Sequence, residues 1–374
     1  QVPTSNYAMP VRSFDDVCGE VISIGERPAL SIHNAAASMR MAVAEAVTNM
    51  MSVPIESISS IRASANWMAA SGNNKEDLAL RNGVEALSKI SIDLNVSIPV
   101  GKDSLSMKTK WSEDNDEFEV TSPLSGVVTA MAPVNNVTVN VTPELNLEED
   151  TSMLLIKLND KNRLAGSIFS EVTKSNYNNT PDIDNVDDFR NMFLLVQEMI
   201  ASKDILSIHD ISDGGLITTL LEMCFTKKIG MNLNLSGVDR VMEYLFSEES
   251  GFVIQVKQKD VTEIKTTFSE KGLAVKEIGQ LKDDIFSINK DDNDLFTKPI
   301  IELEKIWRET SHAIQSLRDN KEIADSELSL LDSNSFSGLI SNINFDESQI
   351  KHLSTKSTNP KVAILREQGV NGQN

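Results

Sequence analysis

One stretch, Ser207 to Leu216, most constrains what this 374-residue chain can fold into. The apolar run Ile205 to Ile208 predicts a strand at its start, and the run Leu216 to Phe225 predicts a helix after it. The Gly-Gly pair between them allows a sharp turn, and the amide groups exposed at the start of a helix favour phosphate. The stretch therefore predicts an α/β unit with an anion site at the turn.

The same stretch also carries groups that suit a metal ion. Asp210 and Asp213 lie on either side of Ser212. Carboxylates beside a phosphate site commonly hold Mg²⁺, because this ion bridges hard carboxylate oxygens to phosphate oxygens. In the alternative interpretation, the aspartates cap the helix and the glycines only form the turn. The spacing alone leaves both interpretations open.

A second pair of candidate ligands lies in the predicted helix from Ala35 to Met51. Nearly every residue of this segment is small or apolar, which predicts a helix that is buried on most sides. Glu45 and Asn49 stand four positions apart and therefore share one face of the helix. A carboxylate and an amide oxygen on that face could bind a metal ion. Without other evidence, a hydrogen-bonded pair that fixes helix packing is the favoured alternative.

The turn Gly101-Lys102-Asp103-Ser104 is a weaker signal. It lacks the upstream glycine of a P-loop and no convincing helix follows it, so it is not a Walker A motif. Lys102, Asp103 and Ser104 could contribute to a cleft, or the Asp and Ser side chains could simply hold the turn.

Composition and charge narrow the class of protein. The composition, 40% hydrophobic and 24% charged, is typical of a globular protein, and the net charge of -20 argues against nucleic-acid binding. No apolar run approaches the roughly 20 residues of a membrane span. Cys18 and Cys224 lie far apart and form no CxxC pair, which favours a reducing compartment. These features predict a cytoplasmic protein that binds neither nucleic acid nor membranes.

The order of predicted elements indicates the fold class. Strand-like runs and a hairpin with its tip near 112–119 precede an acidic segment that ends at Asp150 and resembles a domain boundary. Strands and helices then alternate up to about residue 288, which predicts an α/β (α+β) layer fold with helices packed on a sheet. Residues 136–142 could extend the preceding strand or repeat it. A helix is predicted from Ile300 to Asp319, followed by a polar linker to Asn359.

Several strings of residues together resemble the formylglycinamide ribonucleotide amidotransferase (phosphoribosylformylglycinamidine synthase) family in its long single-chain form. The matching segments are Gly25-Glu26-Arg27, the helix with Glu45 and Asn49, Ser64-Ala65-Asn66-Trp67-Met68, Gly101 to Met107, His209 to Leu216, and Lys361 to Asn371. The resemblance covers essentially the whole chain, in order. The last string resembles the opening of that family's glutaminase domain.

The resemblance implies an ATP-dependent carbon–nitrogen ligase of purine biosynthesis. Such an enzyme converts formylglycinamide ribonucleotide, glutamine and ATP to formylglycinamidine ribonucleotide. Its synthetase region has two halves related by pseudo-twofold symmetry, whose sheet domains pair into a barrel-like core. The chain resembles the second half, with the first half and most of the glutaminase domain lying outside it. The glutaminase catalytic residues would then follow Asn374, so no catalytic residue is assigned.

The resemblance also implies four segments in this chain. They are a synthetase N-terminal-like sheet domain over residues 1–142, a C-terminal-like α/β domain over 150–295, a helix and linker over 296–359, and the start of a glutaminase domain over 360–374.

Carried over residue by residue, the resemblance implies a Mg²⁺–nucleotide site with ATP or ADP. Glu45, Asn49 and Asp210 match the family's metal ligands, and Ser212 matches a nucleotide-contacting position. Ser5, Gly214 and Gly215 are further candidates for nucleotide contact.

One ligand position departs from the family. The family has an aspartate preceded by alanine where this chain has Ser5-Asn6. Because asparagine offers an oxygen without a charge, we expect Asn6 to weaken Mg²⁺ binding. In the family this half holds an auxiliary, largely structural nucleotide. Two alternatives remain open: a non-catalytic nucleotide-binding scaffold, and another ATP-dependent member of the same superfamily.

Overall fold

The computed structural model describes residues 5–13, 16–147, 150–291 and 293–332, together with Asn342, Asn344 and Ala363. The chain divides into a unit that ends at Phe336 and a second unit from Ser337 to Asn374. All helices and strands given below belong to the first unit. Apart from Ala363, the predicted start of a glutaminase domain over 360–374 lies outside the described residues.

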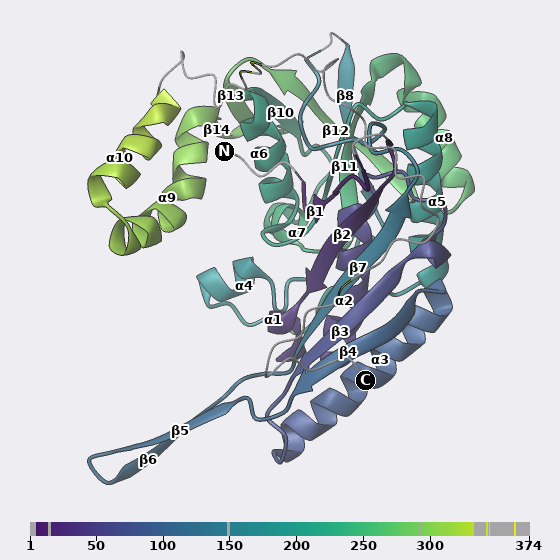
Figure 1. Cartoon of the computed structure of the whole chain (residues 1–374). Helices are drawn as coiled ribbons and strands as arrows, with labels where there is room; N and C mark the ends of the chain where they lie inside the picture. Colours follow the sequence, from purple (N-terminus) through teal and green to yellow (C-terminus); the bar gives the residue numbers. More distant parts are fainter. Residues whose placement is uncertain are drawn as a thin grey trace. The chain divides into compact units, whose positions relative to one another are not determined.

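A five-stranded sheet forms the first part of the fold (Figure 1). Its strands, in spatial order, are β1 (Tyr7–Ala8), β2 (Gly19–Glu26), β7 (Ser125–Val134), β3 (Arg62–Met68) and β4 (Ser97–Ser104). Neighbouring strands are antiparallel except β3 and β4, which are parallel. The helices α2 (Ala35–Met50) and α3 (Asn74–Leu94) pack on one face of this sheet, and the short helix α1 (Pro28–Ser31) precedes α2.

A separate hairpin, β5 (Lys108–Glu113) and β6 (Asp116–Thr121), extends away from this sheet (Figure 1). Trp111 stacks on Phe118 across the hairpin, with ring centroids 5.3 Å apart. The predicted hairpin near 112–119 is therefore confirmed.

A seven-stranded sheet forms the second part, in the order β14-β13-β10-β12-β8-β11-β9. Its strands are β8 (Thr151–Lys157), β9 (Ser207–Asp210), β10 (Gly230–Asn234), β11 (Gly251–Lys257), β12 (Ala274–Lys282), β13 (Ile285–Lys290) and β14 (Asn293–Pro299). Only β10 and β13 are parallel neighbours. The remaining helices are α4 (Ile168–Thr173), α5 (Val186–Ser202), α6 (Gly215–Lys227), α7 (Val241–Phe246), α8 (Val261–Glu270), α9 (Ile300–Arg318) and α10 (Lys321–Ser329).

Helices cover both faces of the second sheet, as the alternation along β8 shows. Leu154 and Ile156 pack into a core with residues of α5 and α8, and this core continues into α2 and the first sheet. Met153 and Leu155 pack into a second core with residues of α6 and α9. All four side chains are buried, because successive residues of a strand point to opposite faces. The predicted α/β layer fold is confirmed.

Gly25 allows β2 to approach α2 closely. A Cβ atom at this position would lie 2.1 Å from the carbonyl oxygen of Ala42 and 2.4 Å from the amide nitrogen of Ala46. This approach brings the side chains of α2 within hydrogen-bonding distance of the backbone of β2. The amide of Asn49 donates to the carbonyl oxygen of Ile24 at 2.8 Å.

Some predicted elements differ from the structure. Residues 136–142 form no strand, although they follow β7 directly. The sequence does not predict β14, in which Leu295 and Phe296 stand among polar residues and Pro299. All but its last residue are exposed, and its backbone pairing with β13 stabilises it. In the described part of the chain, no helix combines the length and hydrophobicity needed to cross a membrane.

We predict that Gly25→Ala lowers the free energy of unfolding by roughly 2–3 kcal/mol, because the new methyl group overpacks the contact between β2 and α2. Urea denaturation measures this loss. Gly72→Ala is the control: no atom lies within 4 Å of its added Cβ, and only its φ of +87° costs about 1 kcal/mol. Equal losses in the two variants would contradict the close approach.

Candidate cation and nucleotide site

Four of the predicted site residues meet around one small cavity between the two sheets. Ser5, Asn6, Asn49 and Asp210 all line it, although up to 205 positions separate them in the sequence. The cavity volume is about 10 Å³, close to the space needed by one water molecule. The cavity can therefore take a single small ion, and a larger ligand would have to lie outside it.

Two buried oxygen atoms at this cavity lack hydrogen-bond partners. They are Oδ1 of Asn49 and Oδ2 of Asp210. The other polar atoms of these side chains are engaged: Nδ2 of Asn49 donates to β2, and Oδ1 of Asp210 accepts a 2.9 Å hydrogen bond from Nδ2 of Asn6. An unpaired buried oxygen costs about 1–3 kcal/mol, so the arrangement favours a bound cation.

Glu45 lies one helical turn before Asn49 but is not among the residues that line the cavity. Its Oε2 accepts the amide N–H of Glu26 at 2.7 Å, and its Oε1 lies 4.0 Å from Nη1 of Arg27. Burial raises the pKa of Glu45 to about 7, although Arg27 and the Glu26 amide act in the opposite direction. The nearby charges of Asp210 and Asp213 contribute to this rise in the pKa of Glu45.

Arg27 is a buried cation of this region, and it faces three carboxylates. Nη2 forms an ion pair with Glu248, and Nη1 lies 3.4 Å from Oδ1 of Asp213 as well as 4.0 Å from Glu45. The side chains of Arg27 and Glu248 are 4% and 1% exposed, so this pair is fully removed from solvent. One guanidinium thus contacts three carboxylates, in a cluster that includes Glu45 but does not line the cavity.

His209 supports Asp210 from within the second sheet. Its Nδ1 lies 3.2 Å from Oδ1 of Asp210, and its Nε2 lies 2.8 Å from Oε2 of Glu222. Burial alone would lower the pKa of His209, but the hydrogen bonds to Asp210 and Glu222 outweigh it and raise this pKa to about 9.

The turn after Asp210 has the predicted strand-to-helix geometry. The amide of Gly215 donates to the carbonyl oxygen of Ser212 at 3.0 Å, and both glycines have positive φ, +83° for Gly214 and +72° for Gly215. The N–H of Gly214 donates to Oε1 of Glu248 at 2.9 Å. Ser212, Gly214 and Gly215 follow Asp210 closely in the sequence, but they do not line the cavity.

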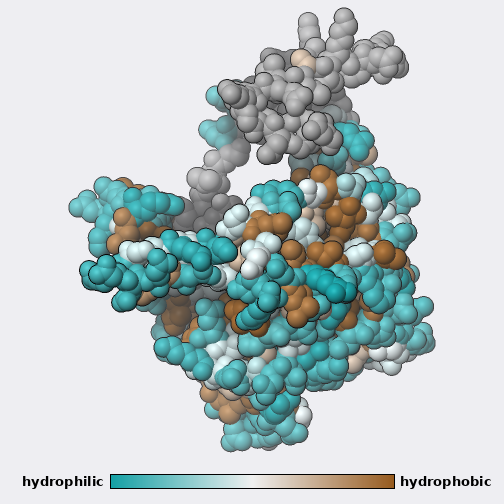
Figure 2. Space-filling view, turned by 90° about the horizontal axis from the view of Figure 1, so that it is seen from below, coloured by the Kyte–Doolittle hydropathy of each residue, from teal (hydrophilic) through white to brown (hydrophobic). Residues whose placement is uncertain are grey.

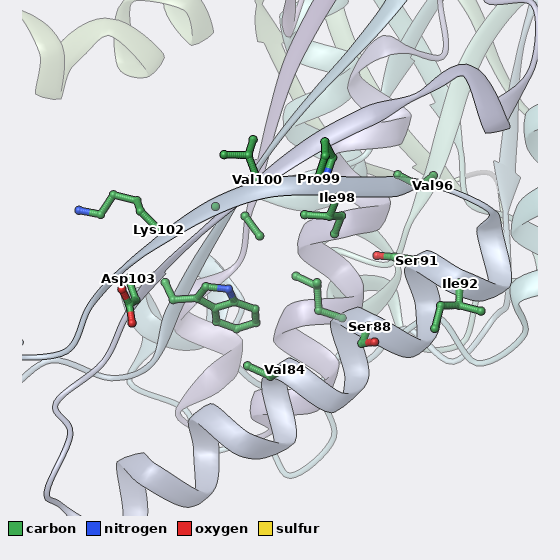
Figure 3. Close-up of a pocket in the computed structure, with 14 residues that line it drawn as sticks. Val84, Ser88, Ser91, Ile92, Val96, Ile98, Pro99, Val100, Lys102 and Asp103 are labelled. Carbon is green, nitrogen blue, oxygen red and sulfur yellow. The ribbon is translucent and has the colours of Figure 1, made fainter. Parts of the chain in front are cut away.

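Lys102 and Asp103 belong to a different hollow, with no lining residue in common with the Asn49–Asp210 cavity. They lie at one end of a groove of about 630 Å³ between β4 and α3, with Val84 and Ile92 on the helix side (Figure 3). Nζ of Lys102 donates to Oγ of Ser104 at 2.9 Å, so both side chains belong to the surface of β4.

Within the described residues, no group of three or more His, Cys, Asp and Glu side chains is arranged to hold a metal ion. The predicted ligand set contains only two carboxylates, Glu45 and Asp210. Its other members, Asn49 and Asn6, offer amide oxygens. Hard oxygen donors of this kind suit Mg²⁺ rather than a transition metal.

Sequence reasoning overlooked the two residues that tie this region together. Arg27 was noted only as part of a string, and Glu248 was not noted at all. The segment Ser247 to Ser250 is fully buried although all four residues are polar. The sequence signal for this cluster is the pair Glu248-Glu249 shortly before the apolar strand β11. A sequence does not show, however, that such residues are buried.

Two regions of the chain match protein-family models. Residues 1–133 match the family described as the FGAR-AT PurM_N-like domain, where FGAR is formylglycinamide ribonucleotide. Residues 151–288 match the family described as the AIR synthase related protein, C-terminal domain. The first match contains the five-stranded sheet except Val134, and the second contains the seven-stranded sheet except β14 and the end of β13. The Asn49–Asp210 cavity is lined by residues of both matched regions.

Solved structures share this fold at low sequence identity. Thermotoga maritima PurL complexed with FGAR superposes with a TM-score of 0.61 at 11% identity, over 81% of this chain and 47% of the PurL chain. The same PurL complexed with ATP gives a TM-score of 0.54 at 10% identity, over 80% and 45% of the two chains. A chain of a HypE–HypF complex gives 0.52 at 12% identity, over 76% and 92%. The chain thus spans about half the length of the PurL chains that it matches.

Proposed function

We propose that this chain, which joins an FGAR-AT PurM_N-like domain to an AIR synthase related C-terminal domain, binds an adenine nucleotide together with Mg²⁺. The convergence of two unpartnered buried oxygens, on Asn49 and Asp210, carries this proposal. Both oxygens border a cavity that admits one small ion. The nucleotide then lies outside the cavity, with its phosphates completing the coordination of the metal.

The donor set supports Mg²⁺ as the ion. Glu45, Asn49 and Asp210 would hold it from two different sheet domains, with Glu45 and Asp210 as the two carboxylate ligands. The bound ion would supply charge neutralisation for the nucleotide phosphates. His209, hydrogen-bonded to both Asp210 and Glu222, would keep the Asp210 carboxylate in position.

We further propose that the chain is part of a formylglycinamide ribonucleotide amidotransferase, with ATP, formylglycinamide ribonucleotide and glutamine as the substrates of the whole enzyme. The PurL structures that share the fold include complexes with FGAR, ATP and ADP. In this proposal the Asn49–Asp210 site is the auxiliary nucleotide site of the second synthetase half, in the long single-chain form of the enzyme and in the cytoplasm. The domain boundaries at 142, 150 and 295 and the glutaminase start at 360 are part of the same proposal.

The face of the first sheet that points away from α2 supports the proposal that a second sheet domain, from the other synthetase half, packs against it. Along β2 and β7 the side chains that point away from α2 include Ile24 and Met131, which are 53% and 38% exposed. Hydrophobic residues also gather in patches among hydrophilic ones on the face shown in Figure 2. An apolar sheet face of this kind fits a second sheet domain packed against it.

We predict that Mg²⁺–ADP binds to the purified chain. Asp210→Asn should weaken this binding at least tenfold, because the side chain loses its charge beside the metal. Even changes to residues that contact only the metal's ligands typically cost roughly 10- to 100-fold in affinity. Isothermal titration calorimetry measures the affinity. Asp103→Asn is the matched control, because Asp103 lies in the separate groove and should leave the affinity unchanged. Absence of binding to the unmodified chain, after removal of any nucleotide that copurifies, would refute the proposed site.

A further prediction concerns Asn6, whose amide now donates to Asp210. Asn6→Asp replaces this hydrogen bond by two adjacent carboxylates, which repel each other unless a cation lies between them. We expect a lower Tm than the unmodified chain in EDTA and a larger rise of Tm on adding Mg²⁺, which differential scanning calorimetry measures. A Tm that does not respond to Mg²⁺ in the variant would argue against a metal at this position.

A further inference from the structure

We propose that the carboxylate of Glu248 acts as an internal anion at the Gly214-Gly215 turn, in the place where a bound phosphate would lie. It thereby positions this turn and Arg27 beside the cation site. The inference goes beyond the proposed function, because it concerns what fills the turn and not what binds at Asn49 and Asp210. It makes Glu248 a positioning residue.

The hydrogen bonds of Glu248 are those that a bound phosphate would receive. Its Oε1 accepts the N–H of Gly214 and the N–H of Ile168, each at 2.9 Å, and its Oε2 pairs with the guanidinium of Arg27. The two amides come from separate segments, one before α6 and one at the start of α4. Backbone amides and an arginine converging on one point form a typical anion site in proteins.

The backbone shape of the turn is built around this contact. A Cβ atom on Gly215 would lie 2.7 Å from the carbonyl carbon of Phe246 and 2.8 Å from the carbonyl oxygen of Ser247. The turn therefore lies directly against the segment that leads into Glu248. The side chain of Glu248 is 1% exposed, so no solvent-derived ion can share the position.

The position of Glu248 determines which groups near Asp210 are open to a ligand. While Glu248 holds the amide of Gly214, phosphate cannot reach that amide. The two glycines consequently serve to shape the turn, and the ion pair between Arg27 and Glu248 links the first sheet domain to the second.

The experiment removes the internal anion and offers an external one. In Glu248→Ala we expect inorganic phosphate to restore stability, with Tm rising by about 3 °C at a concentration near ten times its Kd. The unmodified chain should show no such gain relative to chloride at equal ionic strength. Glu304→Ala is the matched control, since Glu304 is 2% exposed and pairs with Arg308, but the hydrogen bonds it accepts in the described residues come only from that side chain.

Three outcomes would overturn the proposal. One is a Tm of Glu248→Ala that does not depend on phosphate, and the second is an equal gain in Glu304→Ala, which would indicate a general salt effect. The third is an unchanged phosphate response when Arg27→Met is added to Glu248→Ala. If Glu248→Ala does not fold in chloride, its refolding yield in phosphate is measured instead. A higher yield in phosphate than in chloride supports the proposal, and an equally low yield refutes it.

Discussion

The ion pair between Arg27 and Glu248 is the interaction on which the geometry of this molecule depends. It joins the loop after β2 to the segment before β11, and both side chains are buried. Removing one partner of such a pair costs about 3–5 kcal/mol, because the remaining charge is left without compensation. The pair therefore keeps the face of α2 that carries Glu45 and Asn49 opposite the end of β9, where Asp210 lies.

That alignment explains why polar side chains from distant parts of the chain meet at one cavity. Each sheet domain contributes an oxygen that its own fold leaves unpaired, Oδ1 of Asn49 from the first and Oδ2 of Asp210 from the second. Neither domain alone would gain from this arrangement, since buried unpaired oxygens are costly. A cation bound between them would compensate both and would make the contact between the domains favourable.

Much of the fold could be predicted from the sequence, because the helix from Ala35 and the strand β7 have strong apolar patterns. The candidate ligands Glu45 and Asn49 could be placed on one helix face by their spacing alone. Their meeting with Asp210 could not, since it depends on how the two sheets pack. The sequence likewise could not show that Glu248 accepts the amide of Gly214, because burial of a glutamate depends on Arg27, more than 200 positions away.

In the proposed site, domain pairing and cation binding are two aspects of one electrostatic arrangement, in which three carboxylates face the buried guanidinium of Arg27. The most direct test of this account replaces Mg²⁺ by Mn²⁺ in a crystal grown with ADP and locates the ion by its anomalous scattering. The account predicts one peak in contact with Oδ1 of Asn49 and Oδ2 of Asp210, at the roughly 2.0–2.2 Å expected for oxygen ligands of a small divalent cation. A peak elsewhere on the chain, with both oxygens still unpaired, would contradict it.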